Sequence, residues 1–213
     1  MPVFHGSMKR LPKYCEMEKF EFIELKEHEV QELVKEGLKE ELIVYRGRIL
    51  IRAGSLSAEI PESGKMDISG NARKKVTIAS QTDNAGVFHA MGKWRNITSS
   101  GIFAVTNTGG PPDFDTPYDY IKRTSFDNHY HDCDEYWVVI EGEARVASEN
   151  RIYEIGPGDC LYTRMGWHHD VLEVTRGTML RAIWLEGTLK GRQRKGHLWE
   201  PRHGAAEHGQ SKS

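Results

Sequence analysis

Hydrophobic residues along most of this chain fall in short runs that are rich in β-branched and aromatic side chains. Gly, Asn, Asp and Pro separate these runs, and no helical pattern alternates with them. Runs of this kind predict short β-strands. We therefore expect an all-β chain that forms an antiparallel sandwich or barrel and not an α/β fold. The expected strands are LIVYRGRILI, KKVTIAS, GVFHAM, GIFAVTN, YIKRTSF, EYWVVI, ARVAS, RIYEI, DCLYT and LRAIWLE.

One segment near the N-terminus predicts a helix. Between residues 24 and 40, Val30, Leu33, Val34 and Leu38 recur at helical spacing, and Lys and Glu fill the opposite side. This pattern is typical of an amphipathic helix that packs one face on the rest of the fold. A helix that binds a partner protein is the alternative.

The expected domains follow from where the strand-like runs concentrate. Residues 1–74 form an N-terminal extension with the helix and a hairpin, residues 75–187 form the barrel, and residues 188–213 form a tail that begins basic and becomes flexible. Within the barrel, ASENR and GPGD predict tight turns. Residues 107–120 form one long, turn-rich connection. Such a segment is often a lid or a binding loop, and a plain surface loop is the alternative.

Composition and charge narrow the classes of function. The 213 residues carry a formal net charge of −2, which gives no electrostatic reason to expect binding to nucleic acid or to an anionic membrane. No apolar run approaches the ~20 residues that span a bilayer, and the N-terminus lacks the apolar stretch of a secretory signal. We therefore expect a cytoplasmic protein. The odd number of cysteines (Cys15, Cys133 and Cys160) argues against a disulfide framework and suits a reducing compartment.

The densest group of ligand-type side chains lies in the heptapeptide HYHDCDE. Side chains two residues apart on a strand point to the same face, so His129 and His131 point the same way, and Glu135 shares their direction. Two inward imidazoles without acidic partners are costly to bury unless they bind something, and a divalent metal satisfies both. One further ligand would complete the site, and His168 and His169 in RMGWHHD are both candidates.

These segments resemble the two sequence motifs of the cupin family. The resemblance covers roughly residues 100–187. The matching residues are His129-x-His131-x3-Glu135-x6-Gly142 for the first motif, and Gly158-Asp159 followed by Gly166-x2-His169 for the second. The resemblance implies a jelly-roll barrel in which three histidines and one glutamate hold a single divalent metal, with His169 as the second-motif ligand. Fe, Mn, Ni, Co and Zn all suit such donors.

Arg164 is a departure from the second motif. The family usually has proline at this position, two residues before Gly166, so the loop that carries His169 is expected to be less rigid, and an arginine can reach the pocket. The family also often has a glycine before its first histidine, where this chain has TSFDN. We expect His168, Tyr162 and Arg164 to act as catalytic residues beside the metal. The alternatives are solvent exposure of His168 and core packing of Tyr162.

The resemblance implies several functions, because the cupin fold hosts isomerases, epimerases, dioxygenases, decarboxylases, storage proteins and sensors. The first hypothesis is a metal-dependent isomerase or epimerase that acts on a small polar molecule such as a sugar or a hydroxy-carbonyl compound. The second is an Fe(II)-dependent dioxygenase, with Cys133 beside its ligands. The third is a non-catalytic, metal-dependent binding or sensor protein. Cupin relatives are often dimers, so we also expect a homodimer, which a monomeric mass in light scattering would contradict.

Overall fold

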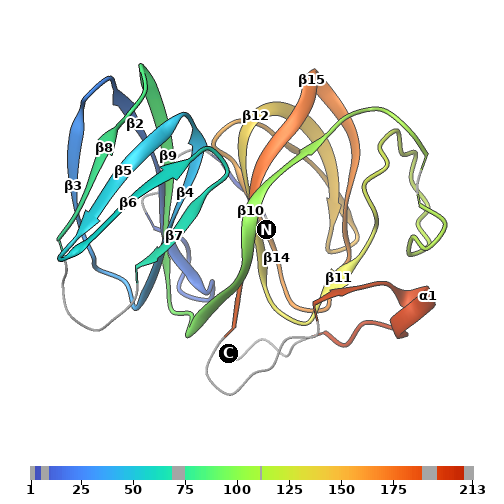
Figure 1. Cartoon of the computed structure of the whole chain (residues 1–213). Coiled ribbons are helices and arrows are strands. Elements are labelled where there is room, and N and C mark those ends of the chain that lie inside the picture. The colour runs from blue at the N-terminus through green and yellow to red at the C-terminus, as the bar shows by residue number, and fades with distance from the viewer. Residues whose placement is uncertain (1–2, 6–9, 69–74, 111, 189–195, 209–213) are drawn as a thin grey trace. The chain divides into compact units, whose positions relative to one another are not determined.

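The structure, a computed structural model, is almost entirely β (Figure 1). It describes residues 3–5, 10–68, 75–110, 112–188 and 196–208. The chain divides into two compact units. The N-terminal unit is Met8–Ile97, and the C-terminal unit combines Met1–Ser7 with Thr98–Ser213. Across the described ranges, no helix is long and apolar enough to cross a membrane.

Two antiparallel four-stranded sheets form the N-terminal unit. Its strands are β2 (Met17–Lys26), β3 (Val30–Val34), β4 (Lys39–Arg46), β5 (Arg48–Ala53), β6 (Leu56–Pro61), β7 (Lys65–Ile68), β8 (Lys75–Ser80) and β9 (Asn84–Gly92). One sheet has the order β2-β9-β4-β7, and the other has the order β3-β8-β5-β6. Leucine, isoleucine and valine side chains from both sheets share one buried cluster, so this unit is a β-sandwich.

The helix expected over residues 24–40 is wrong, because this stretch contains the end of β2, all of β3 and the start of β4. Leu33 is buried, but Val30, Val34 and Leu38 are 61%, 43% and 56% exposed. The four apolar residues therefore share no buried face. β3 instead forms its backbone hydrogen bonds with β8. Short apolar patterns are ambiguous between helix and strand, and here the neighbouring strand decides the outcome.

The boundary expected near residue 75 also differs from the division in the structure, which lies between Ile97 and Thr98. β8 and β9 belong to the N-terminal unit because they pair with its other strands. They also contribute Val76 and Val87 to its buried cluster. The segment that precedes the barrel is therefore a β-sandwich in its own right.

The C-terminal unit is built on a sheet with two unusually long strands. Its strands are β1 (Val3–Phe4), β10 (Asn96–Val105), β11 (Tyr130–His131), β12 (Glu135–Ser148), β13 (Arg151–Ile155), β14 (Cys160–Thr163), β15 (His169–Thr188) and β16 (His197–Leu198), followed by the helix α1 (Glu200–His203). The main sheet has the order β1-β14-β12-β15-β10, and β13 pairs with β12. β12 and β15 pair along most of their length with several register shifts, which bend both strands. Figure 1 shows them curving around the unit, which confirms the expected all-β, jelly-roll barrel.

Local sequence signals explain two features of this unit. Gly142 lies at one of the register shifts with a φ of 81°, and a Cβ there would meet the carbonyl oxygen of Met179 at 2.1 Å. Only glycine combines this conformation with such a close approach of β15. The turn expected at ASENR joins β12 to β13, and Glu149 and Asn150 both have positive φ, as a two-residue hairpin turn requires.

Two expectations for the C-terminal unit are corrected. YIKRTSF forms no strand in the structure. Its hydrogen bonds to β15 include one from Arg123 N to Leu172 O and one from Thr124 Oγ1 to Val171 O. The tail expected over residues 188–213 contains regular structure, because β16 pairs with β11 and is followed by α1. The basic run at 189–195 and the last residues, 209–213, lie outside the described residues.

A buried ion network joins β2, β4 and β9 in the N-terminal unit. His89 is 2% exposed, and its Nδ1 and Nε2 lie 3.0 Å and 2.8 Å from carboxylate oxygens of Glu21 and Glu40. Burial alone would lower the pKa of His89, but the hydrogen bonds and charges of the two carboxylates outweigh burial and raise it. The fold therefore stabilises the protonated imidazole.

We expect His89 to make the free energy of unfolding pH-dependent. Because folding raises its pKa, its contribution is complete below the unfolded pKa of about 6.5 and is lost as the pH rises through the folded value. Urea unfolding between about pH 6 and 9 should show a decline in stability that is smaller in His89→Gln. Equal slopes for the two proteins would contradict this role.

Candidate metal centre

Four side chains of the C-terminal unit converge on one buried space. His129 and His131 precede β12, Glu135 is its first residue, and His169 is the first residue of β15. One ligand atom from each side chain lies within 4.8 Å of every other, and all four residues are buried. The structure thus brings together the two histidines and the glutamate of HYHDCDE with one of the two histidines in RMGWHHD.

Backbone and side-chain hydrogen bonds hold the two ligand-bearing segments together. His129 and His169 form an isolated antiparallel bridge, in which each N–H donates to the other residue's carbonyl oxygen. The Asp134 carboxylate accepts the Tyr162 hydroxyl at 2.8 Å and the Met165 N–H at 3.0 Å. These contacts involve none of the converging ligand atoms. The arrangement is therefore pre-organised by the fold.

The converging atoms point at a common space and not at hydrogen-bond partners. His129 Nε2, His169 Nε2 and Glu135 Oε2 are buried and have no hydrogen-bond partner among the described residues. His169 Nε2 and Glu135 Oε2 are 2.6 Å apart, but this contact lacks hydrogen-bond geometry. Buried polar atoms without partners cost free energy, and a cation between them would remove that cost.

An acceptor lies behind each imidazole. His129 and His169 both place Nδ1 near the carbonyl oxygen two residues earlier, at 2.8 Å and 3.2 Å. His131 Nδ1 lies 3.4 Å from the Glu186 carboxylate. An acceptor at Nδ1 fixes a proton there and leaves the Nε2 lone pair free to bind a metal. The three rings are therefore oriented as metal ligands.

Burial and neighbouring charges set the protonation of these groups. Burial, together with the charge of His169, lowers the pKa of His129 to about 4, and burial lowers the pKa of His131 well below its usual value. For His169, the contact with Glu135 outweighs burial and raises the pKa. Burial would raise the pKa of Glu135, but the nearby histidines lower it. Two neutral imidazoles and an ionised carboxylate are the states in which these groups bind divalent metals.

Comparison with known proteins gives the family. The sequence profile described as "Cupin domain" matches residues 118–186. The uncharacterized protein y4oW of Sinorhizobium fredii is 37% identical over 197 residues, which cover 92% of this chain and 89% of that protein. The chain belongs to the cupin superfamily. The cupin resemblance of the two motifs is thereby confirmed.

Two solved structures share the fold of this cupin at low sequence identity. Oxalate decarboxylase from Bacillus subtilis, in a study of its Mn(II) centres, has a TM-score of 0.53 and 9% identity, and the match covers 81% of this chain and 69% of that one. AerE from Microcystis aeruginosa has a TM-score of 0.54 and 7% identity, and the match covers 79% of this chain and 87% of that one. At such identities the likeness shows the fold alone.

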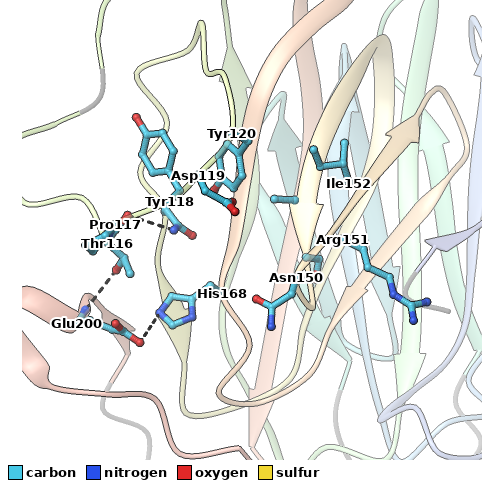
Figure 2. Close-up of a pocket in the computed structure, with 13 residues that line it drawn as sticks. Thr116, Pro117, Tyr118, Asp119, Tyr120, Asn150, Arg151, Ile152, His168 and Glu200 are labelled. Atoms are coloured by element: carbon cyan, nitrogen blue, oxygen red, sulfur yellow. Dashed lines mark hydrogen bonds and ion pairs between the residues drawn. The ribbon is translucent and has the colours of Figure 1, made fainter.

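A cavity of about 530 Å³ lies next to the ligand-bearing segments (Figure 2). Its lining includes Asn128 and His168, which precede His129 and His169 in the sequence, whereas none of the four converging residues is among its lining residues. Residues 116–120 form one wall, and the β12–β13 hairpin forms another. Figure 2 shows His168 between the 116–120 segment and Asn150, whereas the Arg151 side chain points away from the other labelled residues.

The three residues expected to be catalytic lie in different places. His168 lines the cavity, and its Nε2 lies 3.4 Å from the Glu200 carboxylate. The Tyr162 ring stacks on Tyr136, and its hydroxyl donates to Asp134. Arg164 is half-buried in the turn before Gly166. Only His168 of the three lines the cavity.

Sequence reasoning missed three acidic or histidine residues that surround the ligands. Asp127 Oδ2 lies 3.3 Å from His129 Nδ1, and the spacing of two residues is a signal that could have found it. Glu186 and His197 reach the site only because β15 pairs with β12 and β16 pairs with β11. Such pairings between distant segments cannot be read from local spacing.

A buried lysine holds one wall of the cavity in place. The Lys122 side chain is 1% exposed, and its Nζ lies 2.9 Å from carboxylate oxygens of both Asp115 and Asp170. The Tyr120 hydroxyl also donates to Asp170, at 2.9 Å. Burial raises the pKa of Asp170 to about 6 despite the nearby cation. The cavity segment is thus tied to β15 immediately after His169.

We expect Lys122→Met to lower the free energy of unfolding by about 3–5 kcal/mol, because it leaves two buried carboxylates without their cation. Arg176→Met is the matched control, since its ion pair with Glu143 is 80% and 44% exposed. The control should change stability by no more than about 0.5 kcal/mol. Urea unfolding measures both changes, and similar small losses in the two variants would show that Lys122 has no structural role.

Proposed function

We propose that this cupin binds one divalent transition metal through His129, His131, Glu135 and His169, and that the metal serves in the conversion of a small polar molecule. The convergence of three imidazoles and one carboxylate in a buried space, each ring backed by an acceptor at Nδ1, is the observation that carries this proposal. Imidazole and carboxylate donors suit Fe, Mn, Ni, Co or Zn.

A metal bound at this site would supply Lewis acidity toward a carbonyl or hydroxyl oxygen. Apolar rings pack on two of the ligand histidines, His129 and His169, which are 1% and 0% exposed. Phe126 packs on His129 with ring centroids 5.6 Å apart, and Trp137 packs on His169 with ring centroids 5.1 Å apart. Electrostatic interactions are stronger in such a buried environment, so these rings would increase the effect of any charge at the site on a bound molecule.

The lining of the neighbouring cavity supports a polar substrate. Carboxylates of Asp119 and Glu200, amides of Asn128 and Asn150, and the His168 imidazole all contribute to it. These groups donate to and accept hydrogen bonds from hydroxyl and carbonyl groups. We therefore favour a sugar or a hydroxy-carbonyl compound as substrate, and an isomerase or epimerase as the type of enzyme.

Elemental analysis of protein purified without chelators tests the metal site. The wild-type protein should contain about one divalent transition metal per chain, whereas His131→Ala/His169→Ala, which lacks two of four ligands, should retain less than about a tenth of it. His28→Ala is the matched control, because this histidine side chain is 84% exposed. Stoichiometric metal in the double variant would contradict the ligand assignment.

The identity of the bound metal then separates the alternatives for the reaction. Iron, together with oxygen uptake on a thiol, phenolic or diketone substrate, would favour a dioxygenase. Zinc or manganese without any dependence on oxygen would favour the isomerase or epimerase. A ligand that raises the melting temperature and is recovered chemically unchanged would favour the non-catalytic binding protein.

A further inference from the structure

Residues 196–204, which we call the C-terminal strap, lie directly on the metal-ligand segment. β16 pairs antiparallel with β11, so that His197 lies opposite His131. The Tyr130 hydroxyl donates to the carbonyl oxygen of Gly204 at 3.0 Å, and Gly196 N donates to Asp132 Oδ1 at 3.1 Å. Both ends of the strap are thus bonded to the heptapeptide that supplies three of the proposed ligands.

One carboxylate oxygen connects the strap to a proposed ligand. Asp127 Oδ2 accepts Trp199 Nε1–H at 2.5 Å and lies 3.1 Å from His197 Nε2. The same oxygen lies 3.3 Å from His129 Nδ1, which also lies 2.8 Å from the Asp127 carbonyl oxygen. The His197 ring also packs on the His129 ring, with centroids 3.5 Å apart. Two side chains of the strap and one proposed ligand therefore meet at a single acceptor atom.

The strap is anchored beyond this acceptor as well. Trp199 packs edge-on against Phe114 with ring centroids 5.0 Å apart, and the Arg202 guanidinium lies 4.5 Å from the centre of the Phe114 ring. Glu200 N donates to Thr116 Oγ1 at 3.2 Å. The 112–116 segment therefore holds Trp199 in the orientation that directs its N–H toward Asp127.

We propose that Asp127 is a positioning residue that couples the C-terminal strap to His129, so that strap closure and metal binding stabilise one another. This inference rests on the proposed metal site. A carboxylate behind a metal-bound imidazole fixes its orientation and increases its basicity. The Trp199 N–H restricts the rotation of the Asp127 side chain. Because this side chain is already ordered, it loses little further conformational entropy when it orients the His129 imidazole for a metal. By thermodynamic linkage, the free energy by which the closed strap strengthens metal binding equals the free energy by which bound metal stabilises the closed strap.

Co(II) titration of the full chain tests this coupling, with Co(II) absorbance as the readout of the ligand set. Asp127→Asn should weaken Co(II) binding by about 10–100-fold, because it removes the negative charge beside His129 Nδ1 and keeps only the Asp127 carbonyl oxygen as acceptor. Trp199→Phe keeps an aromatic ring but loses the donor, and it should weaken binding by about 3–10-fold. The double variant should bind no more weakly than Asp127→Asn alone, because both changes break one connection.

Trp184→Phe is the matched control. It also removes one indole N–H donor, which bonds to Ser99 Oγ at 3.0 Å in the same unit, and it should leave Co(II) affinity within about twofold of the wild type. Hydrogen exchange provides the second readout. Co(II) should slow amide exchange in residues 196–204 of the wild type, and this protection should be lost in Trp199→Phe.

The possible failures of the two proposals are distinguishable. If the wild-type protein binds no Co(II), the proposed metal site is wrong and the coupling falls with it. If the wild type binds Co(II) while Trp199→Phe has unchanged affinity and unchanged strap protection, the metal site stands and the coupling is overturned. If Asp127→Asn does not fold, Trp199→Phe decides the question by the same two readouts.

Discussion

Burying polar atoms without hydrogen-bond partners is costly, and the candidate metal centre concentrates such atoms in one place. The chain tolerates this because other contacts, the His129–His169 bridge and the hydrogen bonds of Asp134, hold the segments together. A divalent cation satisfies imidazole lone pairs and a carboxylate oxygen at the same time. The bent strands β12 and β15 matter to function because their first residues carry Glu135 and His169 into the same space.

The two units differ in the contacts that their buried histidines make. In the N-terminal unit, each ring nitrogen of His89 has a carboxylate partner, so both are hydrogen-bonded within the fold. In the C-terminal unit, His129 and His169 each have a carbonyl oxygen near Nδ1, and their Nε2 atoms face the common space that Glu135 also borders. This difference separates a structural histidine from a histidine that is oriented to bind a ligand.

Local spacing together with the cupin resemblance named the four converging side chains but not the residues around them. The spacing in HYHDCDE predicts one shared face, and the structure brings these side chains together although β11 and β12 are separate strands. The distance to His169 matches the cupin pattern, so these residues could be named from the sequence. The helix expected over 24–40 failed because pairing of β3 with β8 outweighed a weak helical period. His197 and Trp199 lie in a polar tail without a pattern of their own, and only pairing with β11 brings them to the ligands.

The proposed reaction depends on a metal held by these four ligands, on which the C-terminal strap lies. Diffraction data collected at the absorption edge of the bound metal test the ligand assignment most directly. One anomalous peak, about 2.0–2.2 Å from Nε2 of His129, His131 and His169 and from a Glu135 carboxylate oxygen, is the predicted result. A peak at any other place, or no peak in protein that contains stoichiometric metal, would contradict it.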